Sequence, residues 1–260
     1  MTGSEDRYFS LQADIGITKH MGGRKATDEL ATLCGIGPSQ LVLEIGCGVG
    51  GTSSHLAQAY DCRVVGIDLS PGMVARASSR ALRRGLHDRV AFQVADARHL
   101  PFPAGTFDAV IDESVTAFVP DKQQALREYA RVTRPGGYVG LNEATWVQPP
   151  PAQVVKYVDF IMGGAEFLDA RAWRALLDGA ALQDVTVRTY PFDAIDQYRE
   201  ELRQLDLGDY VQAWRRFLGQ ALSDHTYVQF TKDILGDPGS ILTFVRCIGH
   251  GLYVGRKAAD

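Results

Sequence analysis

A glycine-rich turn is the feature of this sequence best suited to hold a ligand. An apolar run at 41–45 leads directly into Gly46, Gly48, Gly50 and Gly51, and a helical pattern follows. Glycine has no side chain, so such a turn lets a ligand approach the backbone closely. The start of the next helix also offers free backbone N–H groups. Gly46, Gly48 and Gly51 match the spacing G-x-G-x-x-G, which alone is weak evidence for a dinucleotide cofactor.

Three acidic residues are expected to gather around this turn. Glu44 lies two residues before Gly46, where a carboxylate would repel a pyrophosphate and would suit an ammonium group. Asp68 ends the next apolar run, where a carboxylate can accept two hydrogen bonds from a ribose diol. Asp96 ends a third run and is placed to accept a hydrogen bond from the exocyclic amine of an adenine. Asp68 is shared with NAD-binding proteins, whereas Glu44 and Asp96 argue against a nicotinamide cofactor.

The elements that must position these residues alternate along the chain. Short apolar or β-branched runs separated by amphipathic helices predict βαβ units, and so an α/β fold with a parallel sheet covered on both faces. A turn, RPGG, is expected between a helix at 122–132 and the fifth strand. The five runs lie at 41–45, 63–70, 90–96, 107–114 and 137–145.

We expect one domain with additions at both ends. After PPP at 149–151 the alternation gives way to helical patterns, and aromatic residues are frequent from about Phe192 to Ile248. We divide the chain into an N-terminal helical arm, a cofactor-binding core, the end of that core, a helical cap inserted before the last strand, and the last strand with its tail, at 1–37, 38–148, 149–191, 192–248 and 249–260.

Composition excludes several classes of protein. The 260 residues are 45% hydrophobic and 22% charged, which fits a packed globule and excludes wholesale disorder. A net charge of −4 argues against a nucleic-acid partner. The chain has no apolar run near the ~20 residues that span a bilayer, and its first residues lack an apolar signal core. The four cysteines do not cluster, which argues against a metal site, so we expect a cytoplasmic protein with reduced thiols.

Taken together, these segments resemble the class I S-adenosylmethionine-dependent methyltransferases. VLEIGCGVG, VVGIDLSPGMV, VADARHLPFPAGTFDAVI and RVTRPGGYVGLNE occur in the order and spacing of that family, across residues 38–145. The chain looks most like the branch that methylates quinones, sterols and other small metabolites. The resemblance implies a Rossmann-like, seven-stranded, mostly parallel sheet. It also implies S-adenosylmethionine as cofactor, S-adenosylhomocysteine as product, and in-line methyl transfer to a small, partly apolar metabolite.

The resemblance implies that the glycine turn meets the methionine part of the cofactor. Gly46, Gly48 and Gly50 should pass beneath it, with the Gly46 carbonyl near its amino group. Glu44 should orient the turn or reach the amino group through water, or else be a structural acid. Glu113, just after the fourth strand, should contact the methionine part or the acceptor, or else cap the following segment.

On the adenosine side, the resemblance implies a second group of contacts. Asp68 should bind the ribose hydroxyls, and Leu69 should lie against the adenine face. Asp96 should accept a hydrogen bond from the adenine amine, and the backbone N–H of Ala97 should reach the ring. For both acids the alternative is a capping or turn carboxylate.

No catalytic residue is evident, because the sulfonium methyl is already activated and positioning supplies much of the rate. If the acceptor must lose a proton, His20, Glu113 and His225 are the candidate bases. Glu143, at the end of the fifth strand, either contacts the acceptor or is solvated. The cap could also serve as a homodimer surface. The alternatives are a nicotinamide-dependent oxidoreductase and a non-catalytic or non-methylating S-adenosylmethionine-binding protein.

Overall fold

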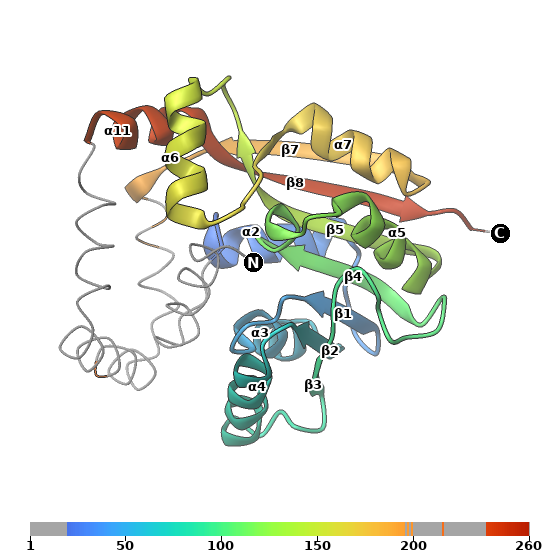
Figure 1. Cartoon of the computed structure of the whole chain (residues 1–260). Helices are drawn as coiled ribbons and strands as arrows, with labels where there is room; N and C mark the ends of the chain where they lie inside the picture. The colour runs from blue at the N-terminus through green and yellow to red at the C-terminus, as the bar shows by residue number, and fades with distance from the viewer. Residues whose placement is uncertain (1–19, 196, 198, 200–214, 216–237, 260) are drawn as a thin grey trace.

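The computed structural model, which describes residues 20–195, 197, 199, 215 and 238–259, is built around one β-sheet (Figure 1). Its strands lie in the order β3-β2-β1-β4-β5-β8-β7, and β6 pairs with β5 off this path. The first five strands are mutually parallel, whereas β8 is antiparallel to both β5 and β7. Their bounds, from β1 to β8, are Leu41–Ile45, Arg63–Asp68, Val90–Val94, Phe107–Glu113, Thr133–Trp146, Leu168–Asp169, Leu182–Pro191 and Ile248–Lys257.

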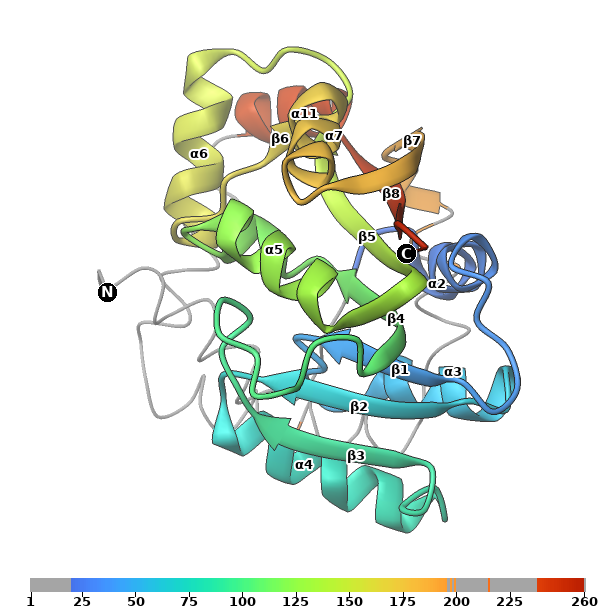
Figure 2. The ribbon, with the colours of Figure 1, turned by 90° about the vertical axis from the view of Figure 1, so that its right-hand side faces the viewer.

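Helices cover both faces of this sheet, as the turned view in Figure 2 shows. On one face, α2 (Gly23–Leu33), α3 (Gly51–Ala59) and α4 (Pro71–Arg83) share an apolar cluster with the strands. On the other, α5 (Lys122–Val132) and α7 (Ala170–Gly179) share a second cluster. The strands are sandwiched between these layers, which explains why they are near-continuous apolar runs.

Three helices begin at a side chain that caps their free N–H groups. Ser70 Oγ accepts from the Met73 N–H at the start of α4, with Pro71 in the first helical position. Asp121 caps α5 and Asp169 caps α7 in the same way. Such a local signal explains why the predicted helix bounds at 122–132 agree with those of α5.

The expected α/β fold is confirmed, with two corrections of detail. The sheet of the described residues has eight strands, because a two-residue strand, β6, pairs with β5. RPGG is not a turn before the fifth strand: it lies inside β5, where the pairing with β4 shifts register between Phe107 and Ala109. Gly136 has a φ of +73°, so the two glycines bend the strand without ending it.

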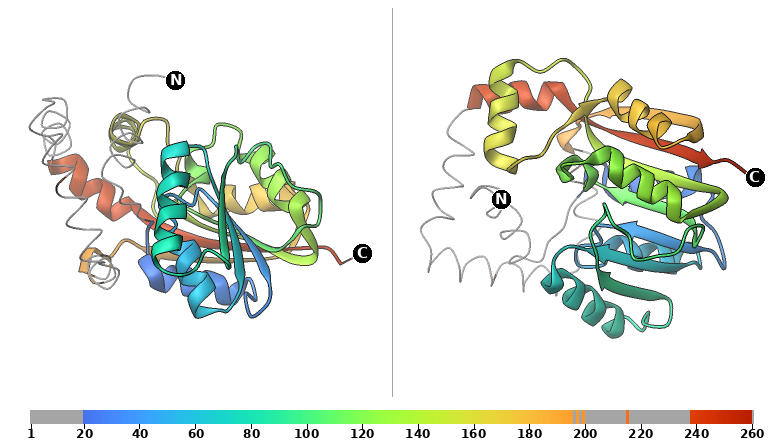
Figure 3. Two further views of the ribbon diagram at one scale, coloured as in Figure 1. Left: turned by 90° about the horizontal axis from the view of Figure 1, so that it is seen from below. Right: turned by 45° about the vertical axis from the view of Figure 1, so that its right-hand side comes forward.

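Beyond the sheet, α6 (Ala152–Met162) and α11 (Pro238–Cys247) lie together at one end of the molecule (Figure 3). α11 is the described part of the expected helical cap, and it leads directly into β8. Most of the rest of the cap, at 196, 198, 200–214 and 216–237 and including His225, lies outside the described residues. Among the helices that the structure describes, none is long and apolar enough to cross a membrane.

The fold brings the chemically interesting residues to one edge of the sheet. β1 lies between β2 and β4, so the order of the strands reverses beside it. Ligands of open α/β sheets bind at such a reversal, beyond the carboxyl ends of the strands. The ends of β1, β2 and β4 carry Gly46, Asp68 and Glu113 respectively.

Candidate functional site

The glycine turn between β1 and α3 has a backbone that only glycine adopts easily. Gly46, Gly48 and Gly50 have φ values of +63°, +51° and +74°. A Cβ on Gly46 would overlap the side chain of Val115, and one on Gly50 would lie 2.8 Å from the Phe92 ring. The turn therefore needs glycine both for its conformation and for its close packing.

Asp68 is tied to this turn by its side chain. Its Oδ2 accepts from the Gly48 N–H at 2.9 Å, and its Oδ1 accepts from the Ser70 N–H at 2.8 Å. Burial raises the pKa of Asp68, and the two N–H groups oppose that shift. A carboxylate offers about four acceptor sites, so one on each oxygen remains for a pair of hydroxyls. The neighbouring Leu69 side chain is 70% exposed, an apolar surface open to a ring.

Asp96 lies two residues beyond the end of β3, slightly outside the strand that the sequence predicts. The Arg98 guanidinium donates to both of its oxygens, with Nη2 2.6 Å from Oδ2. Arg98 lowers the pKa of Asp96. An adenine amine would therefore share this carboxylate with Arg98 or displace it. Ala97, between them, is buried.

Glu44 is buried within β1 and accepts from the Ser53 hydroxyl of α3. Burial raises its pKa to about 8, and the hydrogen bond with Ser53 opposes that rise. In this structure the side chain joins β1 to α3 beneath the turn, which is the role of a structural acid that orients the turn.

Glu113 is the centre of a polar cluster that spans three elements. Its carboxylate accepts from Thr27 of α2 at 3.0 Å, from Thr52 of α3 at 2.9 Å and from Asn142 of β5 at 3.3 Å. His20 Nδ1 lies 3.5 Å from Glu113 Oε1. Two of the candidate bases, His20 and Glu113, are thus brought together, and capping is not the role of Glu113.

The threonines and the asparagine of this cluster were missed by sequence reasoning. Thr52 follows the glycine turn directly, so its place beside a strand end could have been found. Thr27 is 86 residues from Glu113 and carries no motif. Two buried oxygens here, Ser114 Oγ and Asn142 Oδ1, have no hydrogen-bond partner in the part of the chain that the structure describes. Ser114 also has a φ of +61°, and strained residues often mark functional sites.

The residues around the turn fit S-adenosylmethionine. The three left-handed glycines form a cradle whose backbone carries no side chain, so a ligand can approach it closely. The Asp68 carboxylate keeps acceptor capacity beside an exposed Leu69. A diol and an adjoining flat ring are the complementary ligand groups, and both belong to adenosine.

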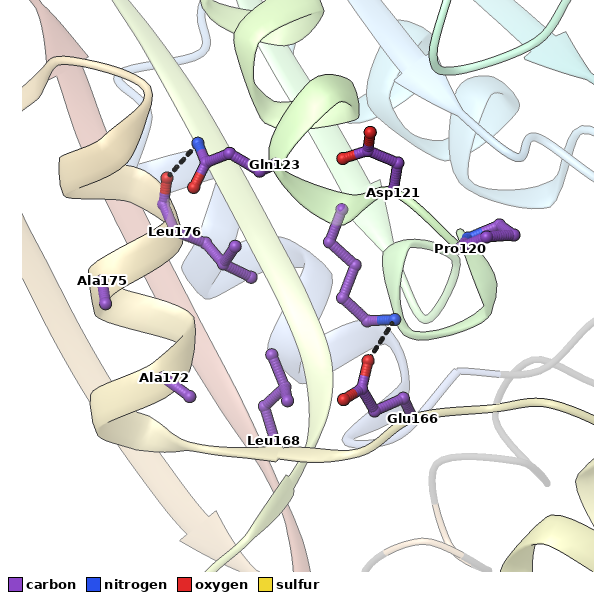
Figure 4. A pocket seen from close by; sticks show the side chains of 9 residues that line it. Pro120, Asp121, Gln123, Glu166, Leu168, Ala172, Ala175 and Leu176 are labelled. Atoms are coloured by element: carbon purple, nitrogen blue, oxygen red, sulfur yellow. Dashed lines mark hydrogen bonds and ion pairs between the residues drawn. The ribbon is translucent and has the colours of Figure 1, made fainter.

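A separate open pocket of about 610 Å³ lies between the start of α5 and α7 (Figure 4). The Lys122 ammonium crosses it to Glu166 at 3.1 Å, and the Gln123 amide donates to the Leu176 carbonyl. No residue of the glycine turn lines it, so it is distinct from the cradle. Its lining residues are Pro120, Asp121, Lys122, Gln123, Glu166, Leu168, Ala172, Ala175 and Leu176.

Comparison with known proteins finds methyltransferases among the proteins similar to this chain. A model of a methyltransferase domain matches residues 43–141. The chain is 29% identical over 218 residues to phosphoethanolamine N-methyltransferase 1 of Arabidopsis thaliana, covering 78% of this chain and 44% of that protein. It is 38% identical over 146 residues to 27-O-demethylrifamycin SV methyltransferase of Amycolatopsis mediterranei, covering 56% and 54% respectively. The chain thus spans about half the length of these curated relatives.

Solved structures share the fold at low identity. The cyclase SpnF superposes with a TM-score of 0.75 at 20% identity, over 98% of this chain and 95% of that one. Phosphoethanolamine N-methyltransferase 2 of Haemonchus contortus superposes with a TM-score of 0.72 at 19% identity, over 98% and 57%. The fold and site define a Rossmann-like α/β protein of the methyltransferase type. The chain carries a class I S-adenosylmethionine-dependent methyltransferase domain.

Proposed function

We propose that this protein transfers the methyl group of S-adenosylmethionine to a small, partly apolar metabolite. The observation that carries the proposal is the left-handed glycine turn joined through Gly48 to the Asp68 carboxylate, with the Glu113–His20 pair at the neighbouring strand end. The bound cofactor supplies a methyl on a positively charged sulfur. The carbon–sulfur bond breaks as the acceptor forms its bond to the methyl, and the sulfur keeps the electron pair.

In this proposal the cofactor is held from two sides. Gly46, Gly48 and Gly50 bring the backbone close to its methionine part. Asp68 accepts from the ribose hydroxyls with its two remaining acceptor sites. Leu69 covers one face of the adenine, and Asp96 with Ala97 binds its edge after Arg98 yields part of the carboxylate. Glu44 holds the turn in place from below through Ser53.

We assign the general base to His20, with Glu113 as its orienting acid. His20 Nδ1 lies 3.5 Å from Glu113 Oε1, 3.3 Å from the Met21 carbonyl and 3.3 Å from the Asn142 amide nitrogen, and in this proposal it carries the proton and donates to the carboxylate. Nε2 is then the nitrogen with the lone pair that accepts the proton of the acceptor. A neutral imidazole supported by a carboxylate can accept a proton from a hydroxyl or an amine. His225 lies outside the described residues and has no role in this proposal.

The acceptor is assigned to the space between the N-terminal arm and the strand ends. The unpartnered Ser114 Oγ and Asn142 Oδ1 beside Glu113 suit hydrogen-bond donors of the acceptor. This arrangement supports one domain, 1–260, with an arm and a cap around its core. The net charge of −4 supports a metabolite over a nucleic acid.

The cap is also proposed as a homodimer surface. Leu242 of α11, in the cap, is 63% exposed, and Phe160 of the adjacent α6, in the end of the core, is 54% exposed. Large exposed apolar side chains of this kind favour association. Light scattering of the purified protein should then report twice the chain mass, and Phe160→Ser should shift it toward the monomer. A chain that is monomeric at high micromolar concentration would remove this part of the proposal.

The test of the activity is release of S-adenosylhomocysteine from S-adenosylmethionine in the presence of an acceptor. Phosphoethanolamine serves as an amine acceptor and 27-O-demethylrifamycin SV as a hydroxyl acceptor, because relatives of this chain are named for them. Loss of a general base costs typically 10²–10⁴-fold, so His20→Ala should lower kcat by that factor while S-adenosylhomocysteine still binds. A wild-type protein that binds neither S-adenosylhomocysteine nor S-adenosylmethionine would refute the proposal.

A further inference from the structure

Two fully buried acids lie beneath the site and take no part in the chemistry above. Asp112, on β4, and Glu143, on β5, both have no exposed surface. Asp112 pairs in register with Leu141, so Glu143 lies two positions farther along the neighbouring strand, on the same face of the sheet. Glu143 is therefore neither solvated nor open to an acceptor, contrary to both expectations from the sequence. Within the described residues, no ion pair joins either acid to a cation.

Each acid uses one oxygen to hold the segment that follows β4. Glu143 Oε1 accepts from the Val115 N–H at 3.0 Å and from the Ala117 N–H at 3.3 Å. Asp112 Oδ2 accepts from the Thr116 N–H at 3.2 Å and from the Thr116 hydroxyl. Three consecutive backbone N–H groups thus end on two carboxyls. Because the single Thr116 hydroxyl proton goes to Asp112, the Tyr129 hydroxyl, 3.0 Å away, donates to Thr116.

The other oxygen of each acid identifies where a proton must lie. Asp112 Oδ1 and Glu143 Oε2 are buried, and no N–H or O–H group of the described residues donates to either. Two ionised carboxylates in contact and away from water repel each other strongly, whereas one shared proton turns the contact into a hydrogen bond. Burial raises the pKa of both acids, and the charge of Asp112 raises that of Glu143 further, so one proton shared between them agrees with both shifts.

The segment held by these acids packs directly on the glycine turn. It begins at Ser114, whose φ of +61° is costly for a residue with a Cβ. The Val115 side chain fills the space where Gly46 has no Cβ. Ser114, Val115 and Gly46 therefore form a continuous contact from the acid pair to the proposed cofactor cradle.

We propose that Asp112 and Glu143 share one proton and act as a positioning pair that holds residues 114–117 against the glycine turn. The pair carries a single negative charge, which the three backbone N–H groups stabilise. The inference rests on the proposed function only in using S-adenosylhomocysteine as a probe of the turn.

Amide substitutions test the pair because an uncharged amide resembles a protonated carboxyl, with one oxygen that accepts and one group that donates. In Glu143→Gln, Oε1 still accepts from Val115 and Ala117 while Nε2 donates to Asp112. In Asp112→Asn, the amide oxygen takes the place of Asp112 Oδ2 and accepts from Thr116, while the amide nitrogen donates to an ionised Glu143. Either single variant keeps one negative charge and one bridging hydrogen. The double variant places two N–H groups against each other, and turning either amide leaves backbone N–H groups without an acceptor.

The experiment is a double-mutant cycle read by thermal unfolding and by calorimetric titration with S-adenosylhomocysteine. We expect each single amide variant to bind within threefold of the wild type, and the double variant to lose at least tenfold in affinity and to unfold well below the additive expectation. Glu143→Leu should also lose at least tenfold, so that glutamine rescues what leucine does not. Asp88→Asn, on a side chain that is 89% exposed, is the control for a lost surface charge.

The shared proton would be refuted if the changes in unfolding temperature were additive and each amide raised that temperature by relieving repulsion between the two carboxylates. Wild-type affinity in the double variant, despite non-additive unfolding, would overturn the positioning role. The unfolding cycle needs no cofactor, so a protein that binds no S-adenosylhomocysteine refutes the proposed function and leaves the shared proton testable.

Discussion

Alanine substitutions at three glycines separate the two reasons why the turn requires glycine. Gly46 combines a φ of +63° with a Cβ position that overlaps Val115. Gly85 has a φ of +65° with no atom within 4 Å of the Cβ position. Gly37 has neither constraint. Gly46→Ala thus measures backbone strain together with steric overlap, Gly85→Ala measures backbone strain alone, and Gly37→Ala measures neither.

The magnitudes follow from these geometries. A left-handed backbone costs an alanine roughly 1–2 kcal/mol, which is the expected loss of unfolding free energy for Gly85→Ala. Overpacking adds about 1–3 kcal/mol, so Gly46→Ala should lose about 2–5 kcal/mol. Gly37→Ala should be neutral or should gain up to about 1 kcal/mol by restricting the unfolded chain.

Urea unfolding of the three variants measures these differences in unfolding free energy. Titration with S-adenosylhomocysteine measures whether the turn still binds the ligand. Gly46→Ala should weaken binding, whereas Gly85→Ala and Gly37→Ala should bind as the wild type does. Adding Val115→Ala to Gly46→Ala should recover most of the overpacking loss while the strain remains. Equal losses for Gly46→Ala and Gly85→Ala, or no recovery in the double variant, would refute the reasoning.

Three further predictions concern the acids of the site. Asp68→Asn should weaken S-adenosylhomocysteine binding at least about 100-fold, since two charge-assisted hydrogen bonds are each worth about 1.5–3 kcal/mol; calorimetry within threefold of wild type would contradict it. Arg98→Ala frees the Asp96 carboxylate of a partly exposed ion pair worth at most about 1 kcal/mol, so the same titration should show up to about fivefold tighter binding, and weaker binding would contradict it. The folded pKa of Glu44 is raised to about 8, so its contribution to stability is complete below its usual pKa of 4.5 and is lost as pH rises toward 8. Glu44→Gln, which still accepts from Ser53, should remove that decline in unfolding midpoints between pH 5 and 8.5, and a decline parallel to wild type would count against it.

Much of the fold could be predicted because its signals are local. The helix α4 is set by Ser70 and Pro71 at its start and by an amphipathic pattern within one segment. RPGG was misread because two consecutive glycines usually indicate a turn, and only the pairing of β5 with β4 shows that they bend a strand. The strand β6 has two residues, too few for any pattern, and it exists because the chain passes beside Thr145 and Trp146.

The candidate site divides along the same line. The glycines and Asp68 were found because each lies at the end of a strand within one contiguous segment, and a parallel sheet brings such ends to one edge. The ion pair between Arg98 and Asp96 is also a short-range feature, since the two residues are two positions apart in the sequence. The surroundings of Glu113 were not predicted, because Thr27 and Asn142 reach it from elements far along the chain.

The sequence by itself determined the cofactor-binding core, because the conformation of the turn and the succession of strands and helices along the chain follow from short-range patterns of glycine, acid and apolar residues. Only the tertiary structure decided which acids are buried and what they hold. Asp112 and Glu143 read as two ordinary acids at strand ends, but neighbouring strands and the layer of α5 remove them from water. Away from water, a carboxyl must share a proton or find donors, and that choice depends on contacts that no local pattern records.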